Sequence, residues 1–179
     1  MRIGICGYAT SGKDEVAQVL VDEFGFQRVN MSDALMRDLL ILDPLVEAPV
    51  GPPERLSALL RVYTYEQAKA RFPDLRRMLQ AYGTDVWRSV DPDVWVRRAD
   101  RTASTIDRVV TTGIRFENEM RGLDHLIHVV RPGVGPVNGH VSDAGIGDVI
   151  ARSDATVLND GSLSQLRERV LAIVAPWIA

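Results

Sequence analysis

The sequence predicts an α/β protein in which a five-stranded parallel sheet is flanked by helices. Short apolar or β-branched runs alternate along the chain with longer segments whose apolar residues recur at helical spacing. Strands that are separated by helices pair in parallel and are covered on both faces. A hydrophobic content of 46% and a charged content of 25% are typical of a globular protein, and a length of 179 residues favours a single domain.

The elements of this core can be assigned from local patterns. The expected strands are Arg2–Cys6, Phe26–Met31, Val109–Thr112, Leu126–Val130 and Ala155–Leu158. The helix after the first strand ends at Gly25, because glycine readily adopts the backbone conformation that stops a helix. The helix after the second strand begins at the candidate cap Ser32-Asp33 and extends to Leu42.

Two segments are expected to be insertions in a core formed by residues 1–42, 106–130 and 144–179. Residues 43–105 begin with a proline-rich loop and continue as helices, expected at 54–63, 65–72, 75–90 and 92–105, with no strand pattern. Residues 131–143 open a connection rich in glycine and proline, of a length that is usually functional in a compact domain. The sequence therefore predicts one domain, residues 1–179, that carries a helical insertion and a short lid.

Charge and cysteine content exclude several classes of function. The 21 basic and 24 acidic residues give a net charge of −3, which argues against a nucleic-acid-binding surface. The single cysteine, Cys6, excludes an internal disulfide and lies in an apolar run that predicts a buried thiol. No run is long enough to span a membrane and the N-terminus has no long apolar leader, so we expect a cytoplasmic protein without a membrane partner. The sequence leaves open whether the protein forms a homodimer.

The residues between the first strand and the first helix match a phosphate-binding pattern. They read Gly7-Tyr8-Ala9-Thr10-Ser11-Gly12-Lys13-Asp14-Glu15 and fit G-x-x-x-x-G-K. In such a loop the backbone N–H groups point inward, the next helix adds its positive dipole end, and the lysine ammonium reaches the β- and γ-phosphates. The pattern predicts ATP binding by these residues, with a purely structural glycine turn as the alternative. The dinucleotide pattern G-x-G-x-x-G and the GTPase pattern N-K-x-D are absent.

Two side chains of this loop carry predictions of their own. Lys13 and Lys69 are the only lysines in a chain with 21 basic residues, and a compact ammonium suits Lys13 where a broad guanidinium would not. Asp14 stands where such loops usually carry a Ser or Thr that ligates Mg²⁺. Its carboxylate could hold Mg²⁺ directly or through water, or it could be an acid favoured by the dipole of the first helical turn.

The Gly-Lys-Asp ending of the loop resembles that of the phage deoxynucleoside monophosphate kinases and of the related animal-type phosphomevalonate kinases. Other stretches resemble the first family in the same order along nearly the whole chain. They are Leu75–Asp85, similar to its substrate-side helix ending in Gly-Thr; Asp91–Trp95, similar to its Asp-Pro-x-x-Trp segment; Val109–Glu119, similar to its strand followed by Arg-Phe-x-Asn-Glu; and His140–Asp143, similar to the His-x-Ser-acid after its lid.

The resemblance implies a P-loop kinase that phosphorylates a (deoxy)nucleoside 5′-monophosphate to the diphosphate with ATP and Mg²⁺, in the host cytoplasm if it is phage-encoded. The insertion would hold the acceptor, and the lid would close over the transfer and exclude water. The chain departs from the family at Gly113, where an aspartate is frequent, and it has no arginine between Pro132 and His140, so Arg131 or an arginine from elsewhere would cover the phosphates. Two alternatives stay open: a kinase for another phosphorylated acceptor, of the phosphomevalonate or dephospho-coenzyme A type, and a non-catalytic nucleotide-binding regulator.

Three basic residues are the candidate catalytic residues, because phosphoryl transfer depends mainly on positioning and charge stabilisation. Lys13 would bridge the donor phosphates. Arg37, one helical turn after Asp33, would hold the acceptor phosphate as a similar family pattern suggests, or it is a solvated helix arginine. Asp33 would orient Mg²⁺-bound water or the acceptor, or cap its helix. Arg115 follows the carboxyl end of a strand, where ligands of open α/β sheets bind, and would clamp a phosphate. Asn118 would bind substrate or cap a short helix.

The remaining candidates would contact the acceptor nucleotide. Arg76 and Gln80 are four residues apart and share a helix face, from which they could bind the phosphate and the base. Gly83-Thr84 end the stretch that resembles the family's substrate-side helix. Trp95 could stack on the base, although an aromatic residue in a helix more often belongs to the core.

Overall fold

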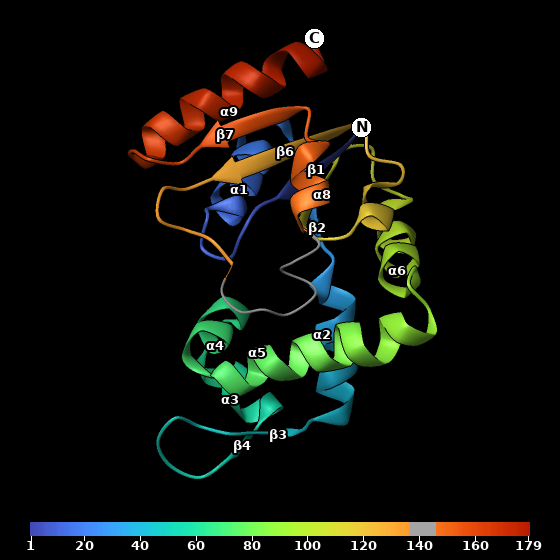
Figure 1. Ribbon diagram of the computed structural model, residues 1–179, viewed down its shortest axis with the longest axis vertical. Helices are drawn as coiled ribbons and strands as arrows, with labels where there is room; N and C mark the ends of the chain where they lie inside the picture. Colours follow the sequence, from blue (N-terminus) through green and yellow to red (C-terminus); the bar gives the residue numbers. More distant parts are fainter. Residues whose placement is uncertain (137–145) are drawn as a thin grey trace. The chain divides into compact units, whose positions relative to one another are not determined.

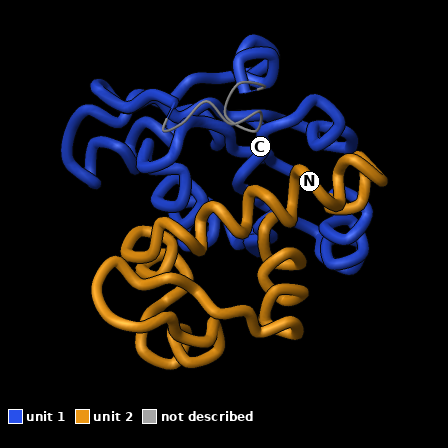
Figure 2. The backbone as a smooth tube through the Cα atoms, turned by 60° about the horizontal axis from the view of Figure 1, so that its bottom comes forward, with its two compact units in different colours: residues 1–31, 96–179 blue, residues 32–95 orange. Residues whose placement is uncertain are grey.

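The computed structural model describes residues 1–136 and 146–179 (Figure 1). These residues form two compact units, drawn in different colours in Figure 2: unit 1 comprises Met1–Met31 and Val96–Ala179, and unit 2 comprises Ser32–Trp95. The bounds of these units are not those of the expected core and insertion: residues 32–42 belong to unit 2, and residues 96–105 belong to unit 1. Most of the expected lid, residues 137–143, lies outside the described residues.

Unit 1 contains a five-stranded sheet in the order β2-β5-β1-β6-β7, in which every neighbouring pair is parallel. The prediction of a five-stranded parallel sheet is confirmed. The strands are β1 (Arg2–Cys6), β2 (Gln27–Asn30), β5 (Val109–Ile114), β6 (His125–Val130) and β7 (Ala155–Leu158). The strands β2 and β5, which come next among these strands along the chain, lie on one side of the central strand β1. The later strands β6 and β7 lie on its other side. The carboxyl end of β1 is therefore a topological switch point, where ligands of open α/β sheets bind.

A bulge interrupts the pairing of β1 with β5 at this same edge. Ile5 pairs with Thr112 but Cys6 pairs with Ile114, so Gly113 is the extra residue. Its φ of 82° lies in the left-handed region that glycine adopts without steric cost. A side chain with a carboxylate at this position would carry backbone strain, which gives a physical reason for the glycine that the sequence shows here.

Helices α1 (Lys13–Phe24) and α9 (Leu163–Ile178) cover one face of the sheet. Ile3 and Ile5 of β1 pack there against Leu20 of α1 and Val170 of α9, and all four side chains are fully buried. The helix α1 ends at Gly25 with a φ of 69°, as the sequence predicts. Because strand residues alternate between faces, Gly4 and Cys6, on either side of Ile5, face the opposite side of the sheet.

The opposite face is covered by three short helical elements of unit 1. They are the part of α6 (Val94–Ala103) from Val96 onward, the 3₁₀-helix η2 (Glu117–Met120) and α8 (Ile146–Ala151). Cys6 faces this side with no exposed surface, which confirms the predicted buried thiol. Burial raises the pKa of the Cys6 thiol to about 12, although the Lys13 charge opposes the shift.

Unit 2 is mainly helical, as expected, but the prediction that it contains no strand is wrong. It comprises α2 (Ser32–Leu42), β3 (Leu45–Val46), β4 (Glu54–Arg55), α3 (Leu56–Val62), α4 (Tyr65–Arg71), α5 (Pro73–Gln80) and the π-helix η1 (Ala81–Arg88), followed by the start of α6. The strands β3 and β4 pair antiparallel. Each has only two residues, too few for an alternating pattern to be visible in the sequence.

Two helices differ in kind from their predictions. The helix expected at 75–90 is an α-helix that begins at Pro73 and changes at Ala81 to a π-helix. The short helix expected at Asn118 is a single 3₁₀ turn, η2. Helical periodicity does not distinguish α from π winding, since the difference is one residue per hydrogen-bonded ring. No helix of the described residues is long and apolar enough to cross a membrane.

Candidate functional site

The predicted phosphate loop connects the central strand β1 to α1 at the carboxyl edge of the sheet (Figure 1). Its backbone takes left-handed conformations, with φ values of 141° at Gly7, 65° at Thr10 and 97° at Gly12. Thr10 is a β-branched residue, for which such a φ is a true outlier and costs on the order of 1 kcal/mol or more. Strain of this kind is concentrated at ligand-binding turns, which agrees with the predicted role of the loop.

Gly7 and Gly12, the two glycines of the pattern, are required by their backbone conformation and also because other atoms lie too close for a Cβ. A Cβ at Gly7 would lie 2.5 Å from the Val129 carbonyl oxygen of β6, which is backbone and cannot move aside. A Cβ at Gly12 would lie 2.3 Å from Nδ2 of Asn159. The loop thus packs closely against β6 and against the residue that follows β7, which restricts where its N–H groups can point.

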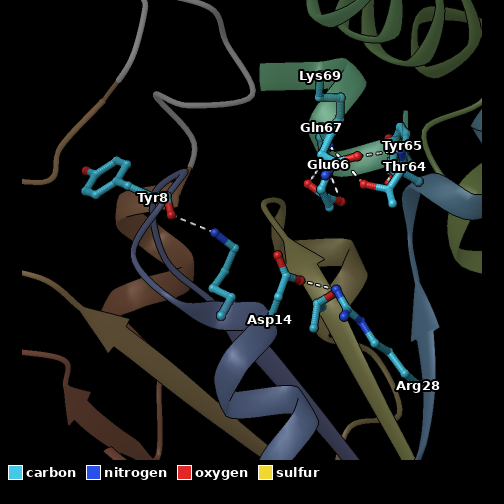
Figure 3. Close-up of polar contacts among 11 residues, drawn as sticks. Tyr8, Asp14, Arg28, Thr64, Tyr65, Glu66, Gln67 and Lys69 are labelled. Atoms are coloured by element: carbon cyan, nitrogen blue, oxygen red, sulfur yellow. Dashed lines mark hydrogen bonds and ion pairs between the residues drawn. The ribbon is translucent and has the colours of Figure 1, made fainter. Parts of the chain in front are cut away.

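Lys13 bends back over the loop that precedes it. Its Nζ donates a hydrogen bond of 2.6 Å to the Tyr8 carbonyl oxygen (Figure 3), and the Ser11 N–H donates to the same carbonyl at 3.2 Å. The ammonium is therefore held by a backbone carbonyl five positions earlier in the chain rather than extended into solvent. A phosphate placed in the loop would meet a cation that is already positioned.

Asn159 fixes the loop from the far side and was not predicted. Its Nδ2 donates to the Ser11 carbonyl oxygen at 2.9 Å, and its backbone N–H donates to the Val130 carbonyl oxygen at 2.7 Å. The residue directly follows β7, which the sequence already places at the carboxyl edge of the sheet. That position is the signal that could have found it.

Asp14, a candidate Mg²⁺ ligand, is paired with an arginine that the sequence did not single out. Arg28 of β2 donates from Nη2 to Oδ1 of Asp14 in an ion pair (Figure 3). The same Nη2 lies 3.5 Å from Oγ1 of Thr112 on β5. The Asp14 side chain is 49% exposed and that of Arg28 is 31% exposed, so the pair remains open to solvent and to ligands.

Arg115 follows β5 directly and is half-buried, and the loop that carries it is organised by Glu119. Glu119 is 5% exposed, and its Oε2 accepts hydrogen bonds from the N–H groups of Arg115 at 2.7 Å and Phe116 at 3.2 Å. Capping the short helix was the alternative role for Asn118, and Glu119 performs that role here. Asn118 itself lies half-buried inside η2. The charged acceptor holds the backbone of Arg115 against the sheet edge.

The donor atoms for a metal are few. Among the described residues, no group of three or more His, Cys, Asp or Glu side chains is arranged to hold a metal ion. Mg²⁺ commonly binds through one or two carboxylates together with substrate phosphates and water, so it does not require such a group. The Asp14 carboxylate fits that mode, because it is an oxygen donor in the first turn of α1 next to Lys13.

The remaining candidate residues belong to unit 2. Asp33 lies in the first turn of α2, which begins at Ser32. Arg37, one turn later, is exposed and donates from Nε to the Asp33 carbonyl oxygen at 3.3 Å. Both side chains lie on the surface of the unit, where a ligand can reach them.

The acceptor candidates of unit 2 gather along α5 and the π-helix. Arg76 and Gln80 are half-buried in α5, and Gly83 and Thr84 lie inside η1. Trp95 is 5% exposed, belongs to the core of the unit, and donates from Nε1 to the Gly83 carbonyl oxygen at 2.8 Å. This arrangement supports the packing role that was the alternative for Trp95. π-Helical turns occur frequently at functional sites, so η1 remains a candidate part of the acceptor site.

Comparison with known proteins adds an independent finding. Residues 64–170 match the family model described as deoxynucleotide monophosphate kinase. A deoxynucleotide monophosphate kinase of Escherichia phage RB69 is 34% identical over 110 residues, and that of Enterobacteria phage T4 is 32% identical over 106 residues. These alignments cover 56% and 54% of this chain but 44% and 43% of the phage proteins, so the chain spans about half the length of the curated relatives it matches.

Solved structures of other proteins are similar to this chain in fold. A Thermus thermophilus protein, TT1252, is 22% identical with a TM-score of 0.52, and the match covers 100% of this chain and 98% of that one. A shikimate kinase from Aquifex aeolicus is 12% identical with a TM-score of 0.51, covering 99% of this chain and 98% of that one. At these identities the likeness concerns the fold alone.

Proposed function

The chain belongs to the deoxynucleotide monophosphate kinase family, and we propose that it transfers the γ-phosphoryl group of ATP to a deoxynucleoside 5′-monophosphate. The observation that carries the proposal is the loop after β1, in which two left-handed glycines and a strained Thr10 surround a lysine held over the loop backbone. A loop of this form at a topological switch point is an anion site for a polyphosphate.

In the proposed reaction this chain supplies positioning and charge. The N–H groups of the loop and the N-terminus of α1 bind the donor phosphates, and the Lys13 ammonium moves from the Tyr8 carbonyl oxygen to the β- and γ-phosphate oxygens. Arg115, placed at the end of β5 by Glu119, stabilises the charge that develops on the transferred group. When bound, Mg²⁺ would neutralise phosphate charge, and Asp14 is the residue we propose to hold it, with Asp33 as the second candidate.

The acceptor is proposed to be bound by unit 2. Arg37 and Arg76 would hold its phosphate, because a guanidinium binds phosphate oxygens with two parallel N–H groups. Gln80, Gly83 and Thr84 would contact the base and sugar from the end of α5 and from η1. Trp95 belongs to this set through the Gly83 carbonyl oxygen that it holds. In unit 1, Asn118 is proposed as a further substrate-binding residue.

The wider setting is proposed from charge and surface. A net charge of −3 supports a small-molecule kinase that binds no nucleic acid. We propose a cytoplasmic location, in a host cell if the chain is phage-encoded. The exposed apolar residues Ile41 and Leu42 at the end of α2 are 83% and 59% exposed, and they offer a surface through which a homodimer could form.

A coupled assay of ADP release tests the proposal directly. Turnover is measured with ATP and Mg²⁺ across deoxynucleoside monophosphates, ribonucleoside monophosphates, phosphomevalonate and dephospho-coenzyme A. We expect turnover with at least one deoxynucleoside monophosphate. The variant Lys13→Ala should lose about 10²-fold or more of kcat, because a preorganised charge at the transferring group is removed.

The other lysine of the chain provides a matched control. Lys69 forms an ion pair of 2.9 Å with Glu66 on α4 and lies 4.3 Å from the centroid of the Tyr65 ring (Figure 3), so Lys69→Ala removes the same charge from a surface helix. It should retain wild-type turnover. ATP binding without turnover on any acceptor would instead support the non-catalytic regulator, and full activity of Lys13→Ala would refute the assignment of the loop.

A further inference from the structure

We propose that Arg28 is a positioning residue that sets how strongly nucleotide binding depends on a divalent cation, because it occupies the carboxylate of Asp14. The inference rests on the proposed binding of nucleotide phosphates at the loop and extends it to a residue outside the loop. Arg28 would compete with the cation for the same carboxylate oxygens.

The geometry of β2 directs Arg28 to the phosphate loop. Val29, the next residue, is buried on the face of the sheet that α6 covers, so Arg28 points to the face covered by α1. The Cα of Arg28 pairs with that of Val110, yet its Nη2 lies 3.5 Å from Oγ1 of Thr112, two residues closer to the carboxyl end of β5. The side chain therefore leans towards the edge of the sheet where the loop lies.

The partner of Arg28 is a charged group in the first turn of α1. Asp14 immediately follows Lys13, and Arg28 donates from Nη2 to its Oδ1. A bare carboxylate here would repel the phosphates of a nucleotide, whereas a carboxylate paired with a guanidinium would not. Arg28 thus provides, without a metal, part of the neutralisation that a cation on Asp14 would provide.

Competition follows from the donor atoms. Mg²⁺ binds carboxylate oxygens, and Asp14 is the carboxylate that the loop itself presents to it. The Asp14 side chain is 49% exposed, so a cation can approach it, but it must displace the guanidinium or share the carboxylate with it. The neighbouring end of β5 offers no second acid, because Gly113 occupies the bulge.

A second ion pair on α1 allows a matched comparison. Arg167 donates from Nε and Nη2 to Oε1 of Glu23, at 2.9 Å and 2.7 Å, near the opposite end of the helix. Its side chain is 48% exposed, and that of Glu23 is 32% exposed. If Arg28 served only to pin α1, Arg28→Gln and Arg167→Gln would have similar effects on nucleotide binding.

The experiment measures ADP binding by isothermal titration calorimetry, once with EDTA and once with saturating Mg²⁺. The quantity compared is the dissociation constant in EDTA divided by the dissociation constant with Mg²⁺. In Arg28→Gln, ADP binding in EDTA should weaken while binding with Mg²⁺ is maintained, so the ratio rises by about two- to five-fold, the range expected for an exposed ion pair. Arg28→Lys keeps the charge and should stay close to wild type. Arg167→Gln should leave the ratio unchanged.

A double variant tests whether Arg28 acts through Asp14. Asp14→Asn should lower the ratio, and adding Arg28→Gln to it should cause no further rise. An unchanged ratio in Arg28→Gln, or a rise that persists in the Asp14→Asn background, would overturn the inference, the second outcome because Arg28 would then contact the nucleotide directly. Absence of ADP binding by the wild-type protein would refute the proposed function itself, which is a different result.

Discussion

The loop that carries Arg115 should depend on the buried carboxylate of Glu119. In Glu119→Ala the N–H groups of Arg115 and Phe116 lose a charged acceptor that now lies at 2.7 Å and 3.2 Å. A hydrogen bond to a charged group contributes about 1.5–3 kcal/mol. Water can replace part of this at two half-buried residues, so we expect the free energy of unfolding to fall by about 2–4 kcal/mol.

The measurement is thermal and urea unfolding followed by tryptophan fluorescence. For a chain of this size a loss of 1 kcal/mol lowers Tm by about 2–4 °C, so Glu119→Ala should lower it by roughly 4–16 °C. Glu117 on the same short helix is the matched control, because its ion pair with Arg152 is exposed on both sides, at 59% and 58%. Glu117→Ala should change stability by less than about 0.5 kcal/mol. Equal effects of the two variants would refute the reasoning.

Two further predictions concern groups away from the phosphate loop. The N–H of Ser57, which donates to Asp43, holds the pKa of that carboxyl below its usual value of 3.8, so its contribution to stability is present above about pH 4 and is lost as the pH falls through the lowered pKa. Urea unfolding of Asp43→Asn should therefore show a weaker fall of stability below pH 4 than the wild type, and parallel curves would contradict this. Burial raises the pKa of Cys6 to about 12 from 9.0, so the thiol stabilises the fold below about pH 9 and this contribution is lost as the pH rises. Labelling of Cys6 by iodoacetamide at pH 8 should follow the rate of unfolding, and labelling at the rate of a free thiol would show that the strand is open.

Local patterns in the chain were sufficient to predict the sheet and the loop. A glycine-rich turn between a buried strand and a helix needs only neighbouring residues to be recognised, and Lys13 stands inside it. The burial of Cys6 and the end of α1 at Gly25 likewise follow from runs of a few residues. These features depend on local backbone preferences and on hydrophobic periodicity, which are properties of sequence alone.

Contacts between distant residues could not be predicted in this way. Arg28 meets Asp14 across 14 positions, and Asn159 meets Ser11 across 148. Nothing in the sequence around Arg28 distinguishes it from a surface residue, because its partner lies in another element. The position of Asn159 after a strand places it at the carboxyl edge of the sheet, but it does not identify Ser11 as its partner. The strand order, which places β5 between β1 and β2, is what brings Arg28 and Thr112 to the same edge.

The features of the proposed phosphate site thus depend on two levels of structure. The glycine-rich turn and its lysine can be recognised from contiguous residues, because such a turn is made by local φ and ψ values. The charge state around that loop is a tertiary property. Whether Asp14 is open to a cation or paired with Arg28 depends on a register between parallel strands, and that register is settled only when the strands pack into one sheet.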